Sequence, residues 1–305
     1  MRPAKRPDSL PFPGAQMNHD HFIVPPGKKI RLSQYDPGFT SHYKTNKDAS
    51  DKLLEDIGQL EKHQSILYAE NTYALLIILQ AMDTAGKDGT IRHVMSGVNP
   101  QGTQVHSFKA PSTEELDHDF LWRCEKALPP RGGIAIFNRS YYEEVLVVRV
   151  HPKTLDSQRL PPGAHGKGIW KRRFDEINHF EEHLFRNGTV ILKFFLNLSK
   201  EEQKRRLLAR IDTPEKNWKF SLADLNERGH WNDYMSAYEE TLNHTSTKCA
   251  PWYIIPADNK WFTRTVVADV IVEKLRSLKL SYPKVSAEDR RHLLDAKERL
   301  NNEPS

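Results

Sequence analysis

Cysteine is nearly absent from this chain: Cys124 and Cys249 are the only two among 305 residues. Two distant thiols cannot form the disulfide framework that stabilises small secreted domains, so they indicate a reducing compartment. Long hydrophobic runs are also missing, since no stretch approaches the ~18 apolar residues that a membrane-spanning helix needs. Residues 1–29 lack the apolar segment of a secretory signal. These absences predict a cytoplasmic protein without a membrane partner.

Neither sign of charge is in large excess. There are 45 Lys and Arg residues against 40 Asp and Glu residues, which gives a formal net charge of +5. This balance is compatible with a polyanionic ligand but does not select one, and a polyanion site would need cations clustered locally. Apolar residues make up 38% of the chain, enough for the core of one large α/β domain or of two smaller ones.

Apolar runs alternate with segments of helical periodicity along most of the chain. Five runs predict strands: 73–81, 104–109, 133–138, 189–198 and 252–256. Five segments predict helices: 49–71 with Ser50 as its N-cap, 87–97, 113–127, 168–187 and 260–278. Strands that alternate with helices pair in parallel through right-handed crossovers. The pattern therefore predicts an α/β fold with helices on both faces of a parallel central sheet.

Segments outside this alternation suggest a domain organisation. Residues 1–48 are rich in Pro, Lys, Asp and His, and predict an N-terminal arm that wraps the surface or is partly disordered. The main domain spans 49–280. Within it, residues 199–245 or so are polar and helical, with helices over 199–210 and 221–242, and we interpret them as an inserted mobile lid. Residues 281–305 form a charged tail with a helix at 286–301.

Residues 81–90 are the most informative segment, because they join a predicted buried strand to a predicted helix through a turn containing Gly86. Backbone N–H groups at a helix N-terminus have no intrahelical partners and bind phosphate. Lys87 would add a positive charge at the outer phosphate. The segment departs from the common phosphate-loop pattern, since Ala81 replaces its first glycine and Asp88 its hydroxyl residue. The alternative is a turn in which Gly86 serves only the backbone.

A carboxylate, Asp83, lies inside this phosphate turn. A carboxylate beside transferring phosphates requires a screening cation or a proton to accept. Mg²⁺ is bound by one or two carboxylates together with phosphate oxygens and waters. Asp83 is therefore our candidate Mg²⁺ ligand, either directly or through water.

A second polar group follows the predicted strand 133–138, where Asn138 precedes Arg139. Phosphate-loop enzymes keep a second metal-organising residue here, usually Asp. Asn138 is neutral and could orient a metal-bound water instead, while Arg139 supplies a positive charge. The alternative is a simple Asn-containing turn.

Basic residues concentrate on the predicted helix 199–210, where Arg206 and Arg210 share a face and Arg205 sits beside it. Arginine binds phosphate oxygens bidentately, so these three are candidate phosphate ligands on the lid. A solvated helix with ion pairs to Glu201 and Glu202 is the alternative.

Taken together, these motifs resemble the polyphosphate kinase 2 family over roughly residues 30–285. The matching runs are 80–90 (QAMDTAGKDGT), 137–146 (FNRSYYEEVL), 217–221 (NWKFS), 231–234 (WNDY), 237–239 (AYE) and 250–258 (APWYIIPAD). The resemblance implies a P-loop kinase-like three-layer sandwich with a helical lid. It also implies Mg²⁺-dependent, reversible phosphoryl transfer between inorganic polyphosphate and nucleotides, and a homodimer or homotetramer.

Site residues follow from the motifs and the resemblance together. The catalytic candidates are Asp83, Lys87, Asn138 and Arg139. The phosphate- and nucleotide-binding candidates are Ala85, Gly86, Asp88, Gly89, Thr90, Arg92, Glu143, Arg205, Arg206 and Arg210.

The residues after Arg139 resemble the class III branch, which acts on nucleoside mono- and diphosphates such as AMP, ADP, GMP and GDP. Glu143 stands where the diphosphate-preferring branch has Asn, which makes it a candidate for selecting acceptor length. Tyr141 departs from the His that is frequent in class III.

Two other functions are compatible with parts of the sequence. An ATP-dependent nucleoside monophosphate kinase of the thymidylate kinase type would share the fold and the phosphate turn. A nucleic-acid-binding module would use the basic helix, but aromatic residues do not interleave with its Lys and Arg residues as stacking platforms would. We therefore expect no nucleic-acid partner.

Overall fold

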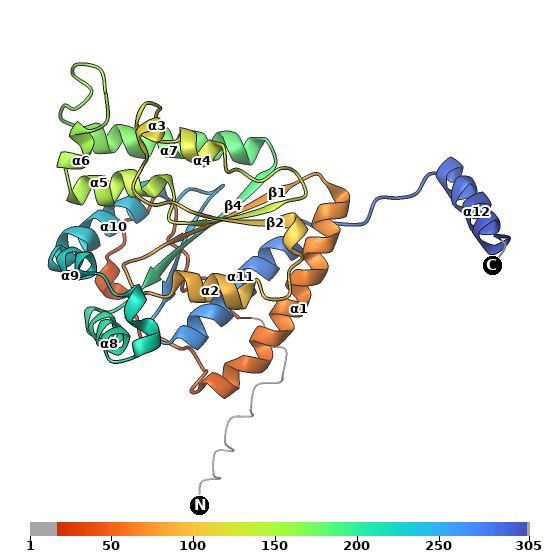
Figure 1. Ribbon diagram of the computed structural model, residues 1–305, viewed down its shortest axis with the longest axis horizontal. Coiled ribbons are helices and arrows are strands. Elements are labelled where there is room, and N and C mark those ends of the chain that lie inside the picture. Colours follow the sequence, from red (N-terminus) through yellow and green to blue (C-terminus); the bar gives the residue numbers. More distant parts are fainter. Residues whose placement is uncertain (1–16, 304–305) are drawn as a thin grey trace, which may run out of the picture.

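The computed structural model describes residues 17–303 and contains a five-stranded, wholly parallel sheet with helices on both faces (Figure 1). The strands are β1 (Ala74–Gln80), β2 (Thr103–Ser107), β3 (Ile134–Asn138), β4 (Thr189–Asn197) and β5 (Trp252–Pro256), in the order β2-β3-β1-β4-β5. The five strand predictions are confirmed, with ends that differ by at most two residues.

The central strand β1 explains why the apolar run after position 73 is continuous. All seven of its residues are buried, since helices cover both faces of the sheet. Ile77 pairs with Ile136 of β3 and with Leu192 of β4. The carboxyl ends of β1 and β3 therefore lie side by side, which brings the segments after Gln80 and after Asn138 to the same edge.

Helices form one layer on each face of the sheet (Figure 1). One layer contains α1 (Asn46–Glu70), α2 (Lys87–Val94) and α11 (Lys260–Ser277), with α11 packed on α1 and α2. The opposite layer contains η3 (Tyr141–Val145), α5 (Val147–Val150), α7 (Ile169–Arg186) and α10 (Trp231–Thr245). This arrangement confirms the predicted three-layer α/β sandwich.

Several shorter helices complete the described chain. They are η1 (Leu32–Gln34), η2 (Pro100–Gly102), α3 (Thr113–Leu116), α4 (Trp122–Glu125), α6 (Lys153–Asp156), α8 (Lys200–Ile211), η4 (Pro214–Lys219), α9 (Leu222–Gly229) and α12 (Ala287–Asn301). Among the residues described, no helix is both long and apolar enough to cross a bilayer.

Three predicted helices have different limits in the structure. The helix predicted over 113–127 is two short helices, α3 and α4, since Asp119 turns the chain by accepting a hydrogen bond from the backbone of Leu121. The helix predicted over 221–242 is divided at His230 into α9 and α10. The prediction of Ser50 as N-cap of the first helix is wrong, because Thr45 and Asp48 form a reciprocal capping box one turn earlier.

The N-terminal arm covers an edge of the sheet. Residues 1–16 lie outside the described part of the chain, whereas the following segment runs along β5. The backbone N–H of Val24 donates to Trp252 at 2.9 Å, and that of Ile254 donates to Phe22 at 2.7 Å. Phe22 and Val24 are buried. The segment that follows residue 16 is therefore paired with β5 through its backbone.

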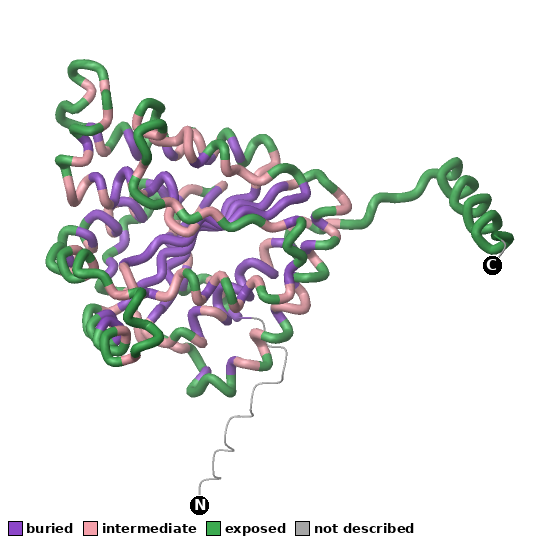
Figure 2. Tube along the Cα trace, in the orientation of Figure 1, coloured by how far each residue is buried: buried purple, intermediate pink, exposed green. Residues whose placement is uncertain are grey.

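The C-terminal helix α12 stands away from the body of the molecule (Figure 1). Figure 2 shows it exposed along its length, in contrast to the buried strands of the sheet.

Candidate active site

The turn after β1 has the geometry of a phosphate-binding loop. Gly86 is the N-cap of α2 with φ = 106°, in the left-handed region that favours glycine. Thr84 also has a positive φ of 66°, a strained conformation for a residue with a side chain. Its Oγ1 is buried without a hydrogen-bond partner in the structure. Strain and an unpaired hydroxyl within one loop are typical of a ligand-binding segment.

Four consecutive backbone N–H groups of this loop are available to a ligand. Within the described chain, the amides of Gly86, Lys87, Asp88 and Gly89 donate no hydrogen bond, while that of Thr90 donates to Gly86 at 2.8 Å. Unpaired amides at a helix N-terminus carry partial positive charge. The loop can therefore bind an anion through its backbone.

Lys87 and Arg139 place two positive charges beside these amides. Lys87 Nζ donates to the carbonyl oxygen of Ala81 at 2.8 Å, which folds its side chain back over the loop. Burial lowers the pKa of Lys87, and the charge of Arg139 acts in the same direction. Arg139 Nη2 lies 3.1 Å from Asp83 Oδ1. A bound phosphate would relieve the repulsion between the two cations.

Arg139 and Asn138 reach the site because β3 ends beside β1. Arg139 has φ = 65°, and its backbone N–H donates to the carbonyl oxygen of Leu79 at 3.1 Å. Asn138 Nδ2 donates to Asp88 Oδ1 at 2.7 Å. Asn138 therefore connects the second motif to the phosphate loop through Asp88.

A wide cleft of about 1200 Å³ opens above the loop. It is lined by every residue predicted for the site except Glu143: Asp83, Ala85, Gly86, Lys87, Asp88, Gly89, Thr90, Arg92, Asn138, Arg139, Arg205, Arg206 and Arg210. Eleven of its lining residues are Lys or Arg, whereas its only acidic lining residues are Asp83 and Asp88. We call this cavity the cationic cleft.

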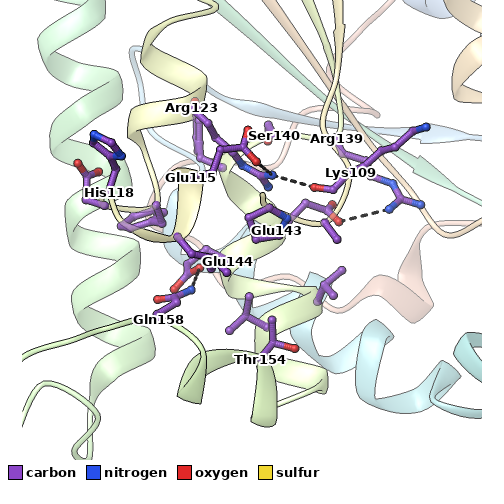
Figure 3. Close-up of a pocket in the computed structure, with 18 residues that line it drawn as sticks. Lys109, Glu115, His118, Arg123, Arg139, Ser140, Glu143, Glu144, Thr154 and Gln158 are labelled. Carbon is purple, nitrogen blue, oxygen red and sulfur yellow. Dashed lines mark hydrogen bonds and ion pairs between the residues drawn. The ribbon is translucent and has the colours of Figure 1, made fainter. Parts of the chain in front are cut away.

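A second, smaller cavity of about 250 Å³ adjoins the cleft and contains Glu143 (Figure 3). Apolar residues form much of its wall, among them Leu116, Phe120, Val147 and Val148. We call it the apolar pocket. Arg139 and Lys109 line both cavities, so the two meet at these residues.

Four of the charged groups that line the apolar pocket form two pairs. Arg139 lies 3.9 Å from Glu143, and Arg123 lies 3.7 Å from Glu115. Gln158 Nε2 donates to Glu144 at 2.7 Å, as the dashed line in Figure 3 marks. Burial raises the pKa of Glu143 against the opposing charge of Arg139. The pocket thus offers apolar surface and directed polar groups rather than an excess of one charge.

The three arginines of α8 have different surroundings. Arg206 is buried and donates all five of its N–H groups within the chain, to Glu202 and to the carbonyl oxygens of Thr84, Ala85, Ala257 and Asp258. In this conformation it has no donor left for phosphate, and it holds α8 against the phosphate loop. Arg205 is exposed and bonds Glu202, while Arg210 bonds Asp224 of α9.

Sequence reasoning missed five of the eleven cations of the cleft, and two of these five, Lys260 and Arg264, belong to α11. They stand four residues apart at the start of α11, directly after β5. Neither makes an ion pair or a side-chain hydrogen bond in the described chain. Burial lowers the pKa of both. The charge of Arg206 adds to this at Lys260, and the charges of Arg92 and Arg206 add to it at Arg264. The rule that ligands bind at the carboxyl ends of parallel strands could have found them.

Asp224 of α9 was also missed. Burial raises its pKa, and the negative charge of Asp83 raises it further. Asp224 lies in the predicted lid and pairs at 3.1 Å with Arg210, which lines the cleft. The charges of Arg139 and Glu143 also act on the pKa of Tyr238 of α10, which burial raises.

A parallel sheet in the order β2-β3-β1-β4-β5, with a phosphate loop after its central strand, defines a P-loop kinase-like protein. Comparison with known proteins identifies the family. The sequence profile of polyphosphate kinase 2 matches residues 43–283, and the chain belongs to this family.

Similar proteins include an ADP-polyphosphate phosphotransferase of Rhodopseudomonas palustris, 52% identical over 92% of this chain and 97% of the relative. An AMP/ADP-polyphosphate phosphotransferase of Meiothermus ruber is 45% identical over 86% of this chain and 94% of the relative. The crystal structure of polyphosphate kinase 2 from Arthrobacter aurescens TC1 superposes with a TM-score of 0.82. It is 40% identical and covers 92% of this chain and 100% of that one. These matches confirm the family that the sequence motifs indicated.

Proposed function

We propose that this enzyme is a polyphosphate:nucleotide phosphotransferase, which moves the terminal phosphoryl group of inorganic polyphosphate to AMP or ADP. One observation carries the proposal: a cationic cleft and an apolar pocket meet at Arg139. The names of the similar proteins from R. palustris and M. ruber support the same substrates.

The cationic cleft suits the polyphosphate donor. Polyphosphate carries about one negative charge per phosphate, and a site for it needs several unpaired cations in a row. Arg92, Lys260 and Arg264 make no ion pair among the described residues, and the four free amides of the phosphate loop lie in the same cleft. Binding here would desolvate few neutral groups and would neutralise many charges.

The apolar pocket suits the nucleoside of the acceptor. A base is flat and mostly uncharged, so it is bound by apolar walls with a few directed polar groups. Phe120 and the valines 147 and 148 supply the walls, while Gln158 and Thr154 supply polar atoms. The acceptor phosphate would then point towards Arg139, where the donor chain ends.

Transfer at this junction depends on position and charge. The donor P–O bond to the bridging oxygen breaks, a bond to the acceptor phosphate oxygen forms, and polyphosphate leaves one unit shorter. The acceptor oxygen is already anionic at neutral pH, so no general base is needed. Lys87, Arg139 and the loop amides hold the phosphates in line and stabilise the charge of the transition state.

Mg²⁺ fits the donor set at Asp83. In the part of the chain that is described, no group of three or more His, Cys, Asp or Glu residues could hold a metal by itself. Mg²⁺ does not require such a cage, because one carboxylate with waters and substrate phosphates is sufficient. Asp83 offers a partly exposed carboxylate beside the loop amides, and its charge raises the pKa of Asp224. A bound Mg²⁺ would screen the charges of the two substrates.

The lid predicted over 199–245 has three parts. Arg206 fixes α8 to the phosphate loop, and α10 is packed in the core through Trp231, Tyr234 and Tyr238. By contrast, η4 and α9 have no buried residue. We propose that residues 212–230 are the part that moves, and that their closure excludes water from the transfer.

The cellular compartment, the oligomeric state and the partners are proposed from the family resemblance. We expect a cytoplasmic homodimer or homotetramer, without a nucleic-acid or membrane partner.

An assay without nucleoside triphosphate tests the function. ADP, long-chain polyphosphate and Mg²⁺ should yield ATP, and AMP should yield ADP. A thymidylate kinase-type enzyme would form no product here and would instead need ATP. Asp83→Asn should lose at least ~100-fold in turnover. If Asp83→Asn turns over normally at saturating Mg²⁺, Asp83 does not hold the metal.

A further inference from the structure

A charged pair is completely buried beneath the sheet, away from both cavities. Lys193 of β4 and Glu181 of α7 each have no exposed side-chain surface, and Lys193 Nζ lies 2.6 Å from Glu181 Oε2. Lys193 also donates to the carbonyl oxygen of Thr245 at 2.6 Å and to the hydroxyl of Tyr142 at 2.8 Å. All three ammonium protons are therefore used.

The partners of Glu181 connect this pair to η3. Its Oε1 accepts hydrogen bonds from two consecutive phenols, Tyr141 at 2.8 Å and Tyr142 at 2.7 Å. Both tyrosines are fully buried. Two neighbouring side chains thus converge on one carboxylate oxygen, which fixes the rotation of the short helix about its axis.

The two phenols belong to the turn that contains Arg139 and Glu143, near the place where the two cavities meet. Tyr141 and Tyr142 lie between Arg139 and Glu143, and Arg139 has the strained positive φ. From the other side, the buried amide of Gln80 lies against Glu143 and Ser140. In the amide orientation that satisfies both neighbours, its nitrogen donates to Glu143 Oε1 at 2.9 Å and its oxygen accepts from the backbone of Ser140 at 3.1 Å. Every side chain from Arg139 to Glu143 is thereby restrained by a polar contact.

The stability of the fold does not require a charged pair at the positions of Lys193 and Glu181. Apolar side chains of similar size often replace a buried ion pair without loss of stability, because the pair must repay the cost of desolvation. An apolar core would not, however, specify the direction of a phenol. Directed hydrogen bonds do specify it, and they hold a strained turn to one conformation.

We infer that Lys193 and Glu181 are positioning residues. Through the hydroxyls of Tyr141 and Tyr142, they set where Arg139 and Glu143 stand between the two substrates. The inference rests on the proposed function, since it assigns the turn a place at the point of transfer.

The first test compares two variants that each lose one phenol hydroxyl. Tyr142→Phe removes a partner of Glu181, whereas Tyr43→Phe removes the hydroxyl of a largely buried tyrosine in the layer on the opposite face. Tyr142→Phe should lower kcat about 10-fold, because a small misplacement of reacting groups is costly. The KM for polyphosphate should change less than about 2-fold, since the cleft stays intact. Tyr43→Phe should retain both constants.

Hydrogen–deuterium exchange gives a readout that does not need activity. In Tyr142→Phe, exchange should become faster in peptides covering residues 139–146 and stay unchanged in the phosphate loop. If the wild-type enzyme does not use polyphosphate, the proposed function fails, and the exchange result still decides the inference. Unchanged exchange in residues 139–146, or equal loss of kcat in Tyr43→Phe, would overturn it.

A second variant separates position from stability. Tyr141→Phe, Tyr142→Phe, Glu181→Met and Lys193→Met together replace the polar set with apolar side chains of similar size. The thermal midpoint should stay within a few degrees of the wild-type value, as for other apolar replacements of buried ion pairs. The kcat should nevertheless fall about 10-fold or more. A stable variant with wild-type kcat would show that the network is only structural.

Discussion

The two cavities that meet at Arg139 offer a ligand different kinds of interaction. The cationic cleft is about 1200 Å³ and lined by eleven Lys or Arg residues, several of them without an acidic partner. The apolar pocket is about 250 Å³, and its main charged groups are already paired with each other. In the proposed function, the first selects a ligand by its charge, and the second selects a ligand by its shape.

This difference between the cavities corresponds to a chemical difference between polyphosphate and nucleotides, the two proposed substrates. The units of a polyphosphate chain are identical, so a cleft that binds by charge can accept any of them in register. Nucleotides differ in base and in phosphate number, and rejecting one of them requires walls and directed polar groups. Substitutions in the two cavities should therefore have separable effects, and only residues at the junction should affect both substrates.

Lys87→Ala should have the largest effect, because Lys87 stands over the loop where the proposed function places both phosphates. Removal of one charged group that stabilises a transition state costs about 100- to 1000-fold in kcat. ATP formation from ADP and polyphosphate measures the loss, and the thermal midpoint checks the fold. Retained turnover in a folded variant would remove the phosphate loop from the mechanism.

Thr154→Trp tests the apolar pocket alone. Thr154 lines this pocket (Figure 3), and its hydroxyl makes no hydrogen bond in the described chain. An indole there should fill the space for the base and raise the KM for ADP at least ~10-fold. The KM for polyphosphate should stay constant. Thr154→Ser is the matched control and should behave like the wild type. An equal rise of both KM values would contradict the separation.

Arg264→Ala makes the converse change in the cationic cleft. Hydrogen bonds to a charged group contribute about 1.5–3 kcal/mol, so the KM for polyphosphate should rise about 10-fold or more. The KM for ADP should remain constant, and the loss should shrink at high salt, which screens the remaining contacts. Arg299→Ala in α12 removes a cation outside the cleft and should change neither constant. A larger effect on ADP would assign Arg264 to the acceptor.

Predictions from the sequence were most successful for features that a single strand or a single loop determines. The apolar run of β1 and the Gly86 turn made the central strand and the phosphate loop predictable, because backbone physics acts locally there. The strand positions then implied that Lys87 and Arg139 share an edge, and the structure places both in one cleft.

Reasoning from spacing was less successful where a side chain chooses among distant partners. Helical spacing placed Arg206 and Arg210 on one face, but it could not show that the carbonyl oxygens of Ala257 and Asp258 engage Arg206. Similarly, about 40 positions in the sequence separate Glu181 from the two phenols that donate hydrogen bonds to it. Such contacts depend on how the helix layers pack on the sheet, and no local sequence pattern predicts them.

Glu143→Asn should have the smallest effect, a change of preference rather than a loss. Glu143 lies 3.9 Å from Arg139, beside the expected path of the acceptor phosphates. Its carboxylate repels a second phosphate more than a first, so the neutral amide should favour ADP over AMP. A charge contribution near 1 kcal/mol corresponds to about a 5-fold shift in the ratio of the two kcat/KM values. Glu115→Gln removes the same charge elsewhere in the apolar pocket and should leave the ratio unchanged. If Glu143→Asn also leaves it unchanged, acceptor length is selected by the shape of the pocket and not by this carboxylate.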